Sequence, residues 1–178
     1  ENHAADLWKG LQESMDLDNW EDISDCLGCI VTRDRANRTL QLSQEQALNK
    51  LLDKLGFSNC NHEHTPMTEG TKLSKRDCPP AAEAATRRDI ATWYRSAIAS
   101  LIYISTWTRP DISFAVSKLC RFMHNPGDAH VRALKRLFRY LRGTSDYGLV
   151  FDFSGKRGCK TGVYGYYDAA HADLSLIH

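Results

Sequence analysis

The segment from residue 130 to residue 144, HVRALKRLFRYLRGT, carries two regular patterns of side chains. Apolar residues recur at steps of three and four, and cationic residues recur at the same steps, offset by one position. Residues three or four apart share a face of an α-helix, so the segment predicts a helix with one apolar face and one positive face. The apolar residues are Val131, Leu134, Leu137, Phe138 and Leu141, and the cations are Arg132, Lys135, Arg136, Arg139 and Arg142. A helix of this kind needs other elements to cover its apolar face.

The positive face has two interpretations. It is either an ordinary solvated surface, since charged residues are mostly exposed, or a surface that binds a polyanion. A solvated face usually mixes charges of both signs, whereas this one has no acidic residue, and four of its five cations are Arg. The planar guanidinium of Arg matches phosphate better than the ammonium of Lys does. The pattern therefore favours contacts with nucleic-acid phosphates, which give salt-sensitive affinity without reading the base sequence.

The charge of the chain is unevenly distributed, although the formal net charge is only +1. Residues 1–30 contain eight acidic residues and one Lys, whereas residues 31–160 contain 22 cations and 12 acidic residues. This asymmetry is a second indication of a polyanionic partner for the middle of the chain. No run of 18 apolar residues occurs, so we expect no membrane span. The chain begins at Glu1 rather than at Met, and we expect it to be a piece of something longer.

The periodicity of apolar residues predicts helices near residues 4–15, 44–55, 91–106, 111–123 and 130–143. Ser43 and Gln46 fit a capping box before the second helix, and Gly56 fits its end. The segment 91–106 is apolar nearly all round, which predicts deep burial. Thr108 and Pro110 suit the start of the next helix, and Asp128 and Gly143 suit the two ends of the last one.

Strand-like patterns occur near both ends of the chain. The runs at 26–31 and 39–42 are separated by the turn-forming TRDRANR, which predicts a hairpin. The runs at 147–153 and 161–170 are the other candidate strands. We therefore expect a mixed α+β fold, mostly helical, with a β-hairpin near the N-terminus and a C-terminal strand pair that begins another domain. Residues 57–89 show no sustained period, and such a long loop is functional, draped on a surface, or disordered.

Two groups of Cys and His residues raise the question of a zinc site. Cys26 and Cys29 form a C-x-x-C pair, and Cys60, His62 and His64 lie close together in the sequence. If DCLGCIVT is one strand, Cys26 and Cys29 point to opposite faces and do not converge. We therefore favour ordinary reduced cysteines over structural zinc, with zinc as the minor alternative.

Several motifs together resemble the copia-type retrotransposon reverse transcriptases. They are YRSAI, TRPDI followed by FAVS, the run RFMHNPGDAHVRALKRLFRYLRGT, and YGLVF, and the resemblance covers nearly the whole chain. It implies that residues 1–56 are the end of a palm with a primer-grip-like hairpin and a first thumb-like helix. Residues 57–89 are then an extended linker, residues 90–146 a helical thumb or connection-like region, and residues 147–178 the truncated start of an RNase H-like domain.

The resemblance also implies roles for individual residues. Leu27 and Gly28 resemble the hairpin turn that holds the primer end, and Gly would let backbone approach backbone or phosphate closely. Asp168 resembles the first metal-binding carboxylate of RNase H, a Mg²⁺ ligand, but Ala170 and His171 depart from the family pattern. One aspartate does not make the carboxylate cluster that two-metal hydrolysis needs. We therefore expect no tightly bound metal in this chain, although the parent enzyme uses Mg²⁺.

The expected function follows from these matches. The chain would be a reverse-transcriptase fragment that contacts an RNA/DNA template–primer duplex together with the rest of the Pol polyprotein. It would be inactive alone because it lacks the Y-x-D-D aspartates of the palm. The family implies an intracellular location, in a cytoplasmic particle or the nucleus. The alternative is a relic or domesticated structural module that binds no nucleic acid.

Overall fold

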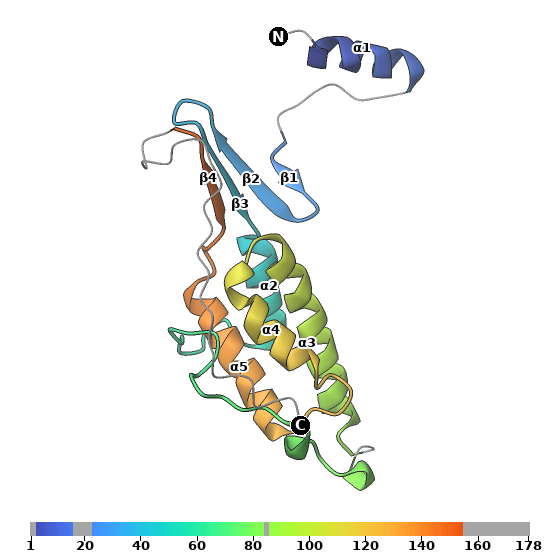
Figure 1. The fold of residues 1–178 in the computed structure, drawn as a ribbon, viewed down its shortest axis with the longest axis vertical. Helices are drawn as coiled ribbons and strands as arrows, with labels where there is room; N and C mark the ends of the chain where they lie inside the picture. Colours follow the sequence, from blue (N-terminus) through green and yellow to red (C-terminus); the bar gives the residue numbers. More distant parts are fainter. Residues whose placement is uncertain (1–2, 16–22, 84–85, 155–178) are drawn as a thin grey trace, which may run out of the picture.

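The computed structural model describes residues 3–15, 23–83 and 86–154, and it has a mixed α+β fold (Figure 1). The helices are α1 (His3–Ser14), α2 (Glu45–Leu55), α3 (Arg88–Trp107), α4 (Ser113–Cys120) and α5 (Asp128–Gly143). Three short 3-10 helices are η1 (Lys75–Asp77), η2 (Ala81–Glu83) and η3 (Pro110–Ile112). The strands are β1 (Asp25–Cys26), β2 (Cys29–Asp34), β3 (Thr39–Ser43) and β4 (Leu149–Asp152). The fold class expected from the sequence is confirmed.

The four strands form one sheet in the order β1-β2-β3-β4, and every neighbouring pair is antiparallel. β2 and β3 make the expected hairpin, with Ile30 opposite Ser43 and Asp34 opposite Thr39. β4 extends the same sheet, since Leu42 lies opposite Leu149. The candidate strand at 161–170 lies outside the described residues. The division of the chain into segments at 56, 89 and 146 stays a prediction.

The hydrophobic core lies among α2, α3, α4 and α5, which pack side by side below the sheet in Figure 1. It receives the apolar face of α5, as the sequence predicts: Leu134, Leu137, Phe138 and Leu141 are fully buried. Burying a side chain of this size stabilises the folded state by about 1.5–3 kcal/mol. The apolar stripe of residues 130–144 therefore has a structural role, and the function of the opposite face can be considered separately.

α3 is buried on one side only, which corrects the expectation that residues 91–106 are buried nearly all round. Tyr94, Ile98 and Leu101 are fully buried, and the Tyr94 hydroxyl donates a hydrogen bond to the Leu119 carbonyl at 2.9 Å. Ile102 and Tyr103 on the other side are 39% and 38% exposed. Apolar composition alone does not distinguish a core helix from one that presents aromatic residues at a surface.

Two helix starts also differ from the predicted caps. The N-cap of α2 is Gln44, whose side chain accepts a hydrogen bond from Thr108 at 2.9 Å. The Ser43 hydroxyl accepts a hydrogen bond from the Glu45 N–H at 3.2 Å, but the described residues show no return bond from Gln46, so the predicted capping box is not formed there. The N-cap of α5 is Gly127, whose N–H donates to Nδ1 of His130 at 2.9 Å. Asp128 is therefore the first helical residue rather than the cap.

The predicted ends of α2 and α5 are confirmed. Gly56 follows α2 with a left-handed φ of 78°, and Gly143 is the last residue of α5. Thr108 does not begin a helix but follows α3 as its C-cap, while Pro110 begins η3 as expected.

Within residues 57–83 the chain is mostly irregular and runs along α5, as the green trace beside the orange helix shows (Figure 1). Phe57 packs against Phe138 of α5, with ring centroids 5.1 Å apart. η1 lies so close to the start of α5 that a Cβ on Gly127 would come within 1.7 Å of the Asp77 carbonyl oxygen. The sequence left three alternatives for residues 57–89: a functional loop, a loop draped on a surface, or a disordered one. The described part is a loop draped on the surface of α5.

Candidate nucleic-acid interface

The cationic face of α5 is not uniformly exposed. Arg132, Lys135 and Arg142 are exposed, whereas Arg136 and Arg139 are partly covered, with side chains 29% and 39% exposed. The sequence predicted the row of five cations on one face, and the helix confirms that arrangement. What covers Arg136 and Arg139 is a segment of the same chain.

Residues 58–65, which we call the strap, lie along the cationic face of α5. Nε of Arg142 donates to the carbonyl of Ser58 at 2.6 Å, and Nε of Arg139 donates to the carbonyl of Asn61 at 2.8 Å. Further along the strap, the N–H of Glu63 donates to the carbonyl of Arg139 at 3.3 Å. The strap therefore runs antiparallel to the helix, and successive Arg side chains hold successive parts of it.

Glu63 is the only acidic residue of the strap, and its carboxylate lies between two Arg side chains. One oxygen is 2.8 Å from Nη1 of Arg136 and the other is 3.2 Å from Nη1 of Arg139. Nη2 of Arg136 also donates to the hydroxyl of Thr65 at 3.0 Å. A carboxylate shared by two guanidinium groups is a strong, charge-assisted arrangement. The strap therefore satisfies part of the positive charge of α5 within the chain.

The strap divides the five cations of α5 into two groups. Arg136, Arg139 and Arg142 hold the strap, whereas Arg132 and Lys135 make no hydrogen bond or ion pair with the residues described. Sequence reasoning missed Glu63 because a single acid in an irregular segment carries no pattern. The only signal was the length of the loop beside a helix with unbalanced charge.

Leu27 and Gly28 form a two-residue turn between β1 and β2, and both have positive φ, 53° and 75°. Positive φ at two central residues is the geometry of the tightest β-hairpins, but it is unfavourable for Leu. Leu27 is also 71% exposed, so burial does not offset this cost. The hydroxyl of Tyr103 on α3 donates a hydrogen bond to the Leu27 carbonyl. A strained, exposed apolar residue at a braced turn is typical of a functional contact.

The turn also corrects the interpretation of the C-x-x-C pair. Cys26 and Cys29 are directly opposite each other in the antiparallel ladder, so their side chains share a face of the sheet. The prediction that they point apart was wrong because DCLGCIVT is two strands and a turn rather than one strand. Burial raises the pKa of the Cys29 thiol, which keeps it protonated at neutral pH.

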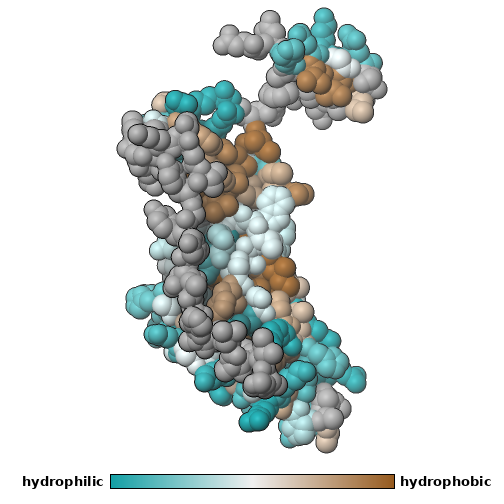
Figure 2. All heavy atoms as spheres, in the orientation of Figure 1, coloured by the Kyte–Doolittle hydropathy of each residue, from teal (hydrophilic) through white to brown (hydrophobic). Residues whose placement is uncertain are grey.

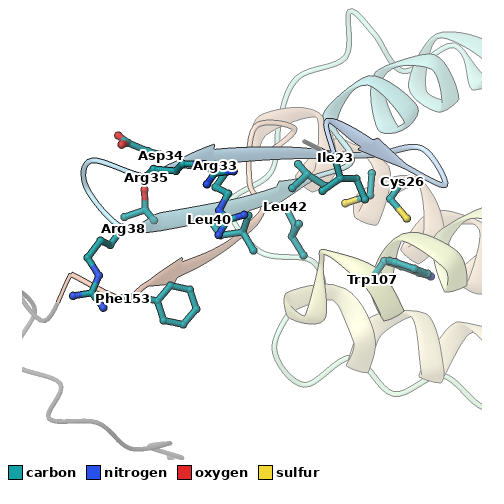
Figure 3. Close-up of a pocket in the computed structure, with 13 residues that line it drawn as sticks. Ile23, Cys26, Arg33, Asp34, Arg35, Arg38, Leu40, Leu42, Trp107 and Phe153 are labelled. Carbon is teal, nitrogen blue, oxygen red and sulfur yellow. The ribbon is translucent and has the colours of Figure 1, made fainter. Parts of the chain in front are cut away.

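Both cysteines line a hollow of about 810 Å³ on the face of the sheet, where it meets the end of α3 (Figure 3). Its wall is mostly apolar, with Leu40, Leu42 and Trp107 along one side, and Arg33 and Arg38 lie toward the β2–β3 turn. From the viewing side of Figure 2, hydrophobic surface gathers over the sheet, and hydrophilic surface predominates at the far end of the helices.

A buried cluster holds the junction between the helices and the sheet. Arg109 is 2% exposed, and its guanidinium forms a two-bond pair with Asp111, at 2.9 and 2.7 Å. The hydroxyl of Tyr140 donates to the same carboxylate at 2.8 Å. Burial alone would raise the pKa of Asp111, but these hydrogen bonds and the charge of Arg109 outweigh it and hold that pKa below the usual range. Sequence reasoning placed Asp111 only at a helix start and did not find this cluster.

The described residues contain no group of three or more His, Cys, Asp or Glu side chains that could hold a metal ion. His62 and His64 lie edge to face, with ring centroids 5.2 Å apart. Asp168, the expected Mg²⁺ ligand, lies outside the described residues, and the described part offers no carboxylate cluster for that ion. Within the same residues, no helix is long and apolar enough to cross a membrane.

No family model and no solved structure matches the chain. Among curated proteins, the retrovirus-related Pol polyprotein of transposon TNT 1-94 from Nicotiana tabacum is 36% identical over 165 residues, which make up 93% of this chain and 12% of that protein. The Pol polyprotein of transposon RE1 from Arabidopsis thaliana is 37% identical over 130 residues, 73% of this chain and 8% of that protein. The corresponding protein of transposon RE2 is 33% identical over 159 residues, 89% of this chain and 10% of that protein.

These relatives define the class of protein. The chain spans only about a tenth of their length, with shares between 8% and 12%. It belongs to the copia-type retrotransposon Pol polyproteins, as one segment of such a protein. The family resemblance seen in the sequence is confirmed at this level.

Proposed function

We propose that the chain is a reverse-transcriptase segment whose α5 surface contacts the phosphates of an RNA/DNA template–primer duplex. The observation that carries this proposal is the one-sided row of five cations on a helix whose other face is fully buried. Arg132 and Lys135 are exposed on that row. Exposed cations on a rigid element attract a polyanion at little cost in ordering, because the helix already fixes their spacing.

The Leu27–Gly28 turn supports the same proposal. Its backbone is strained, it is exposed, and Tyr103 fixes its position relative to the helices. Leu27 and Gly28 are both exposed, so the backbone of the turn is open to contact with the end of a nucleic-acid strand. We assign it the role of holding the primer end.

The segment is non-catalytic alone in this proposal. Nucleotidyl transfer needs carboxylates that hold metal ions, and the sequence has no Y-x-D-D motif. Mg²⁺ therefore belongs to the parent polyprotein, of which this segment would be the duplex-holding part. The proposal places the parent inside the cell, in a particle or the nucleus.

A structural module without nucleic-acid binding is the second candidate, and the strap is the observation that favours it. Three of the five cations, Arg136, Arg139 and Arg142, already have partners in the strap. If Arg132 and Lys135 are only solvated, the row needs no external partner. The two candidates differ in whether these two side chains contribute to binding.

Equilibrium binding to a fluorescent RNA/DNA primer–template at low salt distinguishes the two candidates. The double variant Arg132→Gln and Lys135→Gln keeps the strap contacts and removes only the two cations of the row that do not hold the strap. The matched control replaces two exposed cations elsewhere, Arg95→Gln and Arg121→Gln. We expect at least tenfold weaker binding for the first variant and less than twofold change for the control. No binding by the unaltered chain would favour the structural module, and equal binding by the two variants would show that Arg132 and Lys135 are not the contact.

A further inference from the structure

A groove of about 320 Å³ lies between α5 and the segment that follows the strap. One wall is the first half of α5, and the other is formed by residues 67–73. The lining residues are Met67, Thr68, Thr71, Lys72, Leu73, Ala129, Arg132, Ala133 and Arg136. Counted from Ala129, the other three α5 residues lie three, four and seven positions further along, so all four share one helix face. The groove therefore results from the packing of an irregular segment on a regular helix.

The lining has the composition of an anion site with an apolar base. Lys72, Arg132 and Arg136 are its charged residues, and no acidic residue lines it. Thr68 adds a hydroxyl group, whereas the Thr71 hydroxyl already donates to the Thr68 carbonyl at 2.6 Å, and the other side chains are aliphatic or Met. A few polar groups converging over an apolar floor are typical of sites that orient a small ligand group. The sign of the charge selects an anion.

The cations of the groove differ in how far they are already engaged. Arg136 directs its two terminal nitrogens to Glu63 and Thr65. Arg132 and Lys72 make no hydrogen bond or ion pair with the residues described, and both are exposed. Arg136 therefore anchors the wall, while Arg132 on α5 and Lys72 on the opposite wall retain donors that no described residue uses.

Two carboxylates lie near Arg132, and both are already engaged. The hydrogen bonds from Ser74 to Asp77 lower the pKa of that carboxyl, and Arg132 adds to the effect through its charge. The hydrogen bond and charge of Arg87 do the same for Asp128, again with a contribution from Arg132. Neither carboxylate forms an ion pair with Arg132 within the described residues, so the guanidinium of Arg132 retains its donors for a ligand.

We propose that this groove binds one phosphodiester group of a nucleic-acid strand, held between Arg132 and Lys72 with the Thr68 hydroxyl as a further donor. The inference rests on the proposed function and names the place at which the α5 surface contacts the nucleic-acid strand. Guanidinium groups pair with phosphate oxygens through two parallel N–H bonds, and a Lys ammonium adds a point charge. The groove is at the lower limit of ligand-pocket volumes, about 300 Å³, so it fits one nucleotide backbone unit rather than a base pair.

The strap has a defined part in this proposal. Glu63 and the three Arg residues that bind the strap fix residues 58–65, and residues 67–73 continue directly from them. The position of Lys72 relative to Arg132 therefore depends on the strap. The Arg residues of α5 therefore have two roles. Arg136, Arg139 and Arg142 hold the strap and with it the groove wall, and Arg132 contacts the nucleic-acid strand.

The test uses the full chain and two probes, inorganic phosphate and the dinucleotide thymidylyl-thymidine, whose single phosphodiester carries no terminal phosphate. NMR resonances of Thr68, Thr71 and Ala133 report binding. We expect the dinucleotide to shift these resonances, with at least fivefold weaker binding in the double variant Lys72→Gln and Arg132→Gln. The control Arg95→Gln and Arg121→Gln keeps its affinity. Circular dichroism establishes that each variant is folded.

The same variants are then compared for binding to the primer–template duplex. The groove proposal predicts a slope of log K against log salt that is about 1–2 units less steep in Lys72→Gln and Arg132→Gln. Duplex binding with an unchanged slope and no dinucleotide shift would overturn the groove and leave the proposed function intact. If inorganic phosphate shifts these resonances but the dinucleotide does not, the groove is a site for free anions, and the proposal that it binds a nucleic-acid strand is overturned. Failure to bind either the dinucleotide or the duplex would overturn both.

Discussion

Arg109 and Thr144 are joined by two hydrogen bonds of 2.7 Å, although 35 residues separate them in the sequence. Nη1 of Arg109 donates to the Thr144 carbonyl, and Nη2 donates to the Thr144 hydroxyl. Thr144 follows α5 directly and leads to β4, while Arg109 follows α3. The pair therefore fixes the ends of two core helices at the point where the chain returns to the sheet.

Replacing Arg109 tests the importance of this junction. Arg109→Met should lower the free energy of unfolding by about 3 kcal/mol, because it leaves Asp111 without its charged partner and Thr144 without its donors. Chemical denaturation measures the change. Arg121→Met, at an exposed site, is the control and should cost less than about 0.5 kcal/mol. Similar values for the two variants would contradict a structural role for the cluster.

Two apolar residues test the assignment of the core. Leu101→Ala and Leu119→Ala should each destabilise by about 2–5 kcal/mol, since both side chains are 0% exposed. Leu7→Ala, at a residue 67% exposed in α1, is the matched control and should change stability by less than about 0.5 kcal/mol. If both core variants were as stable as the control, the packing of α3 and α4 would be different from the one described.

The stability of the fold should depend on pH through His130. Its ring is fully buried and stacks on Phe122 at 3.9 Å between centroids, and Nδ1 accepts the Gly127 N–H. Burial lowers the pKa of His130, although the nearby carboxylate of Asp77 opposes this. A His with a depressed folded-state pKa contributes stability above its unfolded value of about 6.5, and that contribution is lost as the pH falls below it.

The measurement is the free energy of unfolding between pH 7.5 and pH 5 for the unaltered chain and for His130→Gln. The unaltered chain should lose stability more steeply as the pH falls, because only its unfolded state takes up a proton at position 130. The comparison of slopes removes the contribution of other titrating groups. Parallel curves would show that His130 does not titrate on unfolding in this range.

Glu63 gives a test of the strap. Glu63→Gln should raise the rate of amide hydrogen exchange at residue 63, because the bond to the Arg139 carbonyl loses its support from two ion pairs. A partly exposed pair of this kind is worth about 1 kcal/mol, which corresponds to roughly fivefold faster opening. Glu69→Gln, at a residue that follows the strap and has no ion pair among the described residues, is the control. Equal exchange in the two variants would mean that the strap is held by other contacts.

The local elements could be predicted because their signals lie within a few residues. The apolar stripe of α5, the hairpin of β2 and β3, and Gly56 at the end of α2 all follow from spacing and backbone preference. The contacts between distant segments could not be predicted in this way. Glu63 meets Arg136 and Arg139 only after the loop folds back on α5, and Arg109 meets Thr144 only after the core has formed.

Several of the errors lie at the ends of helices and strands. DCLGCIVT was interpreted as one strand because Leu27 does not resemble a residue that adopts positive φ. Gln44 is the N-cap of α2, and its side chain accepts a hydrogen bond from Thr108, 64 residues further along the chain. At α5 the competing contact is local, since the Gly127 N–H donates to the ring of His130, three residues further on. Spacing and helix preference alone do not reveal either contact.

The salt dependence of binding to an RNA/DNA primer–template duplex tests the central claim most directly, because neutralised phosphates set the slope of log K against log salt. With Arg132 and Lys135 both on phosphate, the unaltered chain should show a slope of about −2 or steeper, similar for duplexes of unrelated sequence. The variant Arg132→Gln and Lys135→Gln should lose about 2 units of that slope while its circular dichroism stays unchanged. If the folded, unaltered chain fails to bind the duplex at low salt, or binds with the same slope as this variant, α5 is not the nucleic-acid surface.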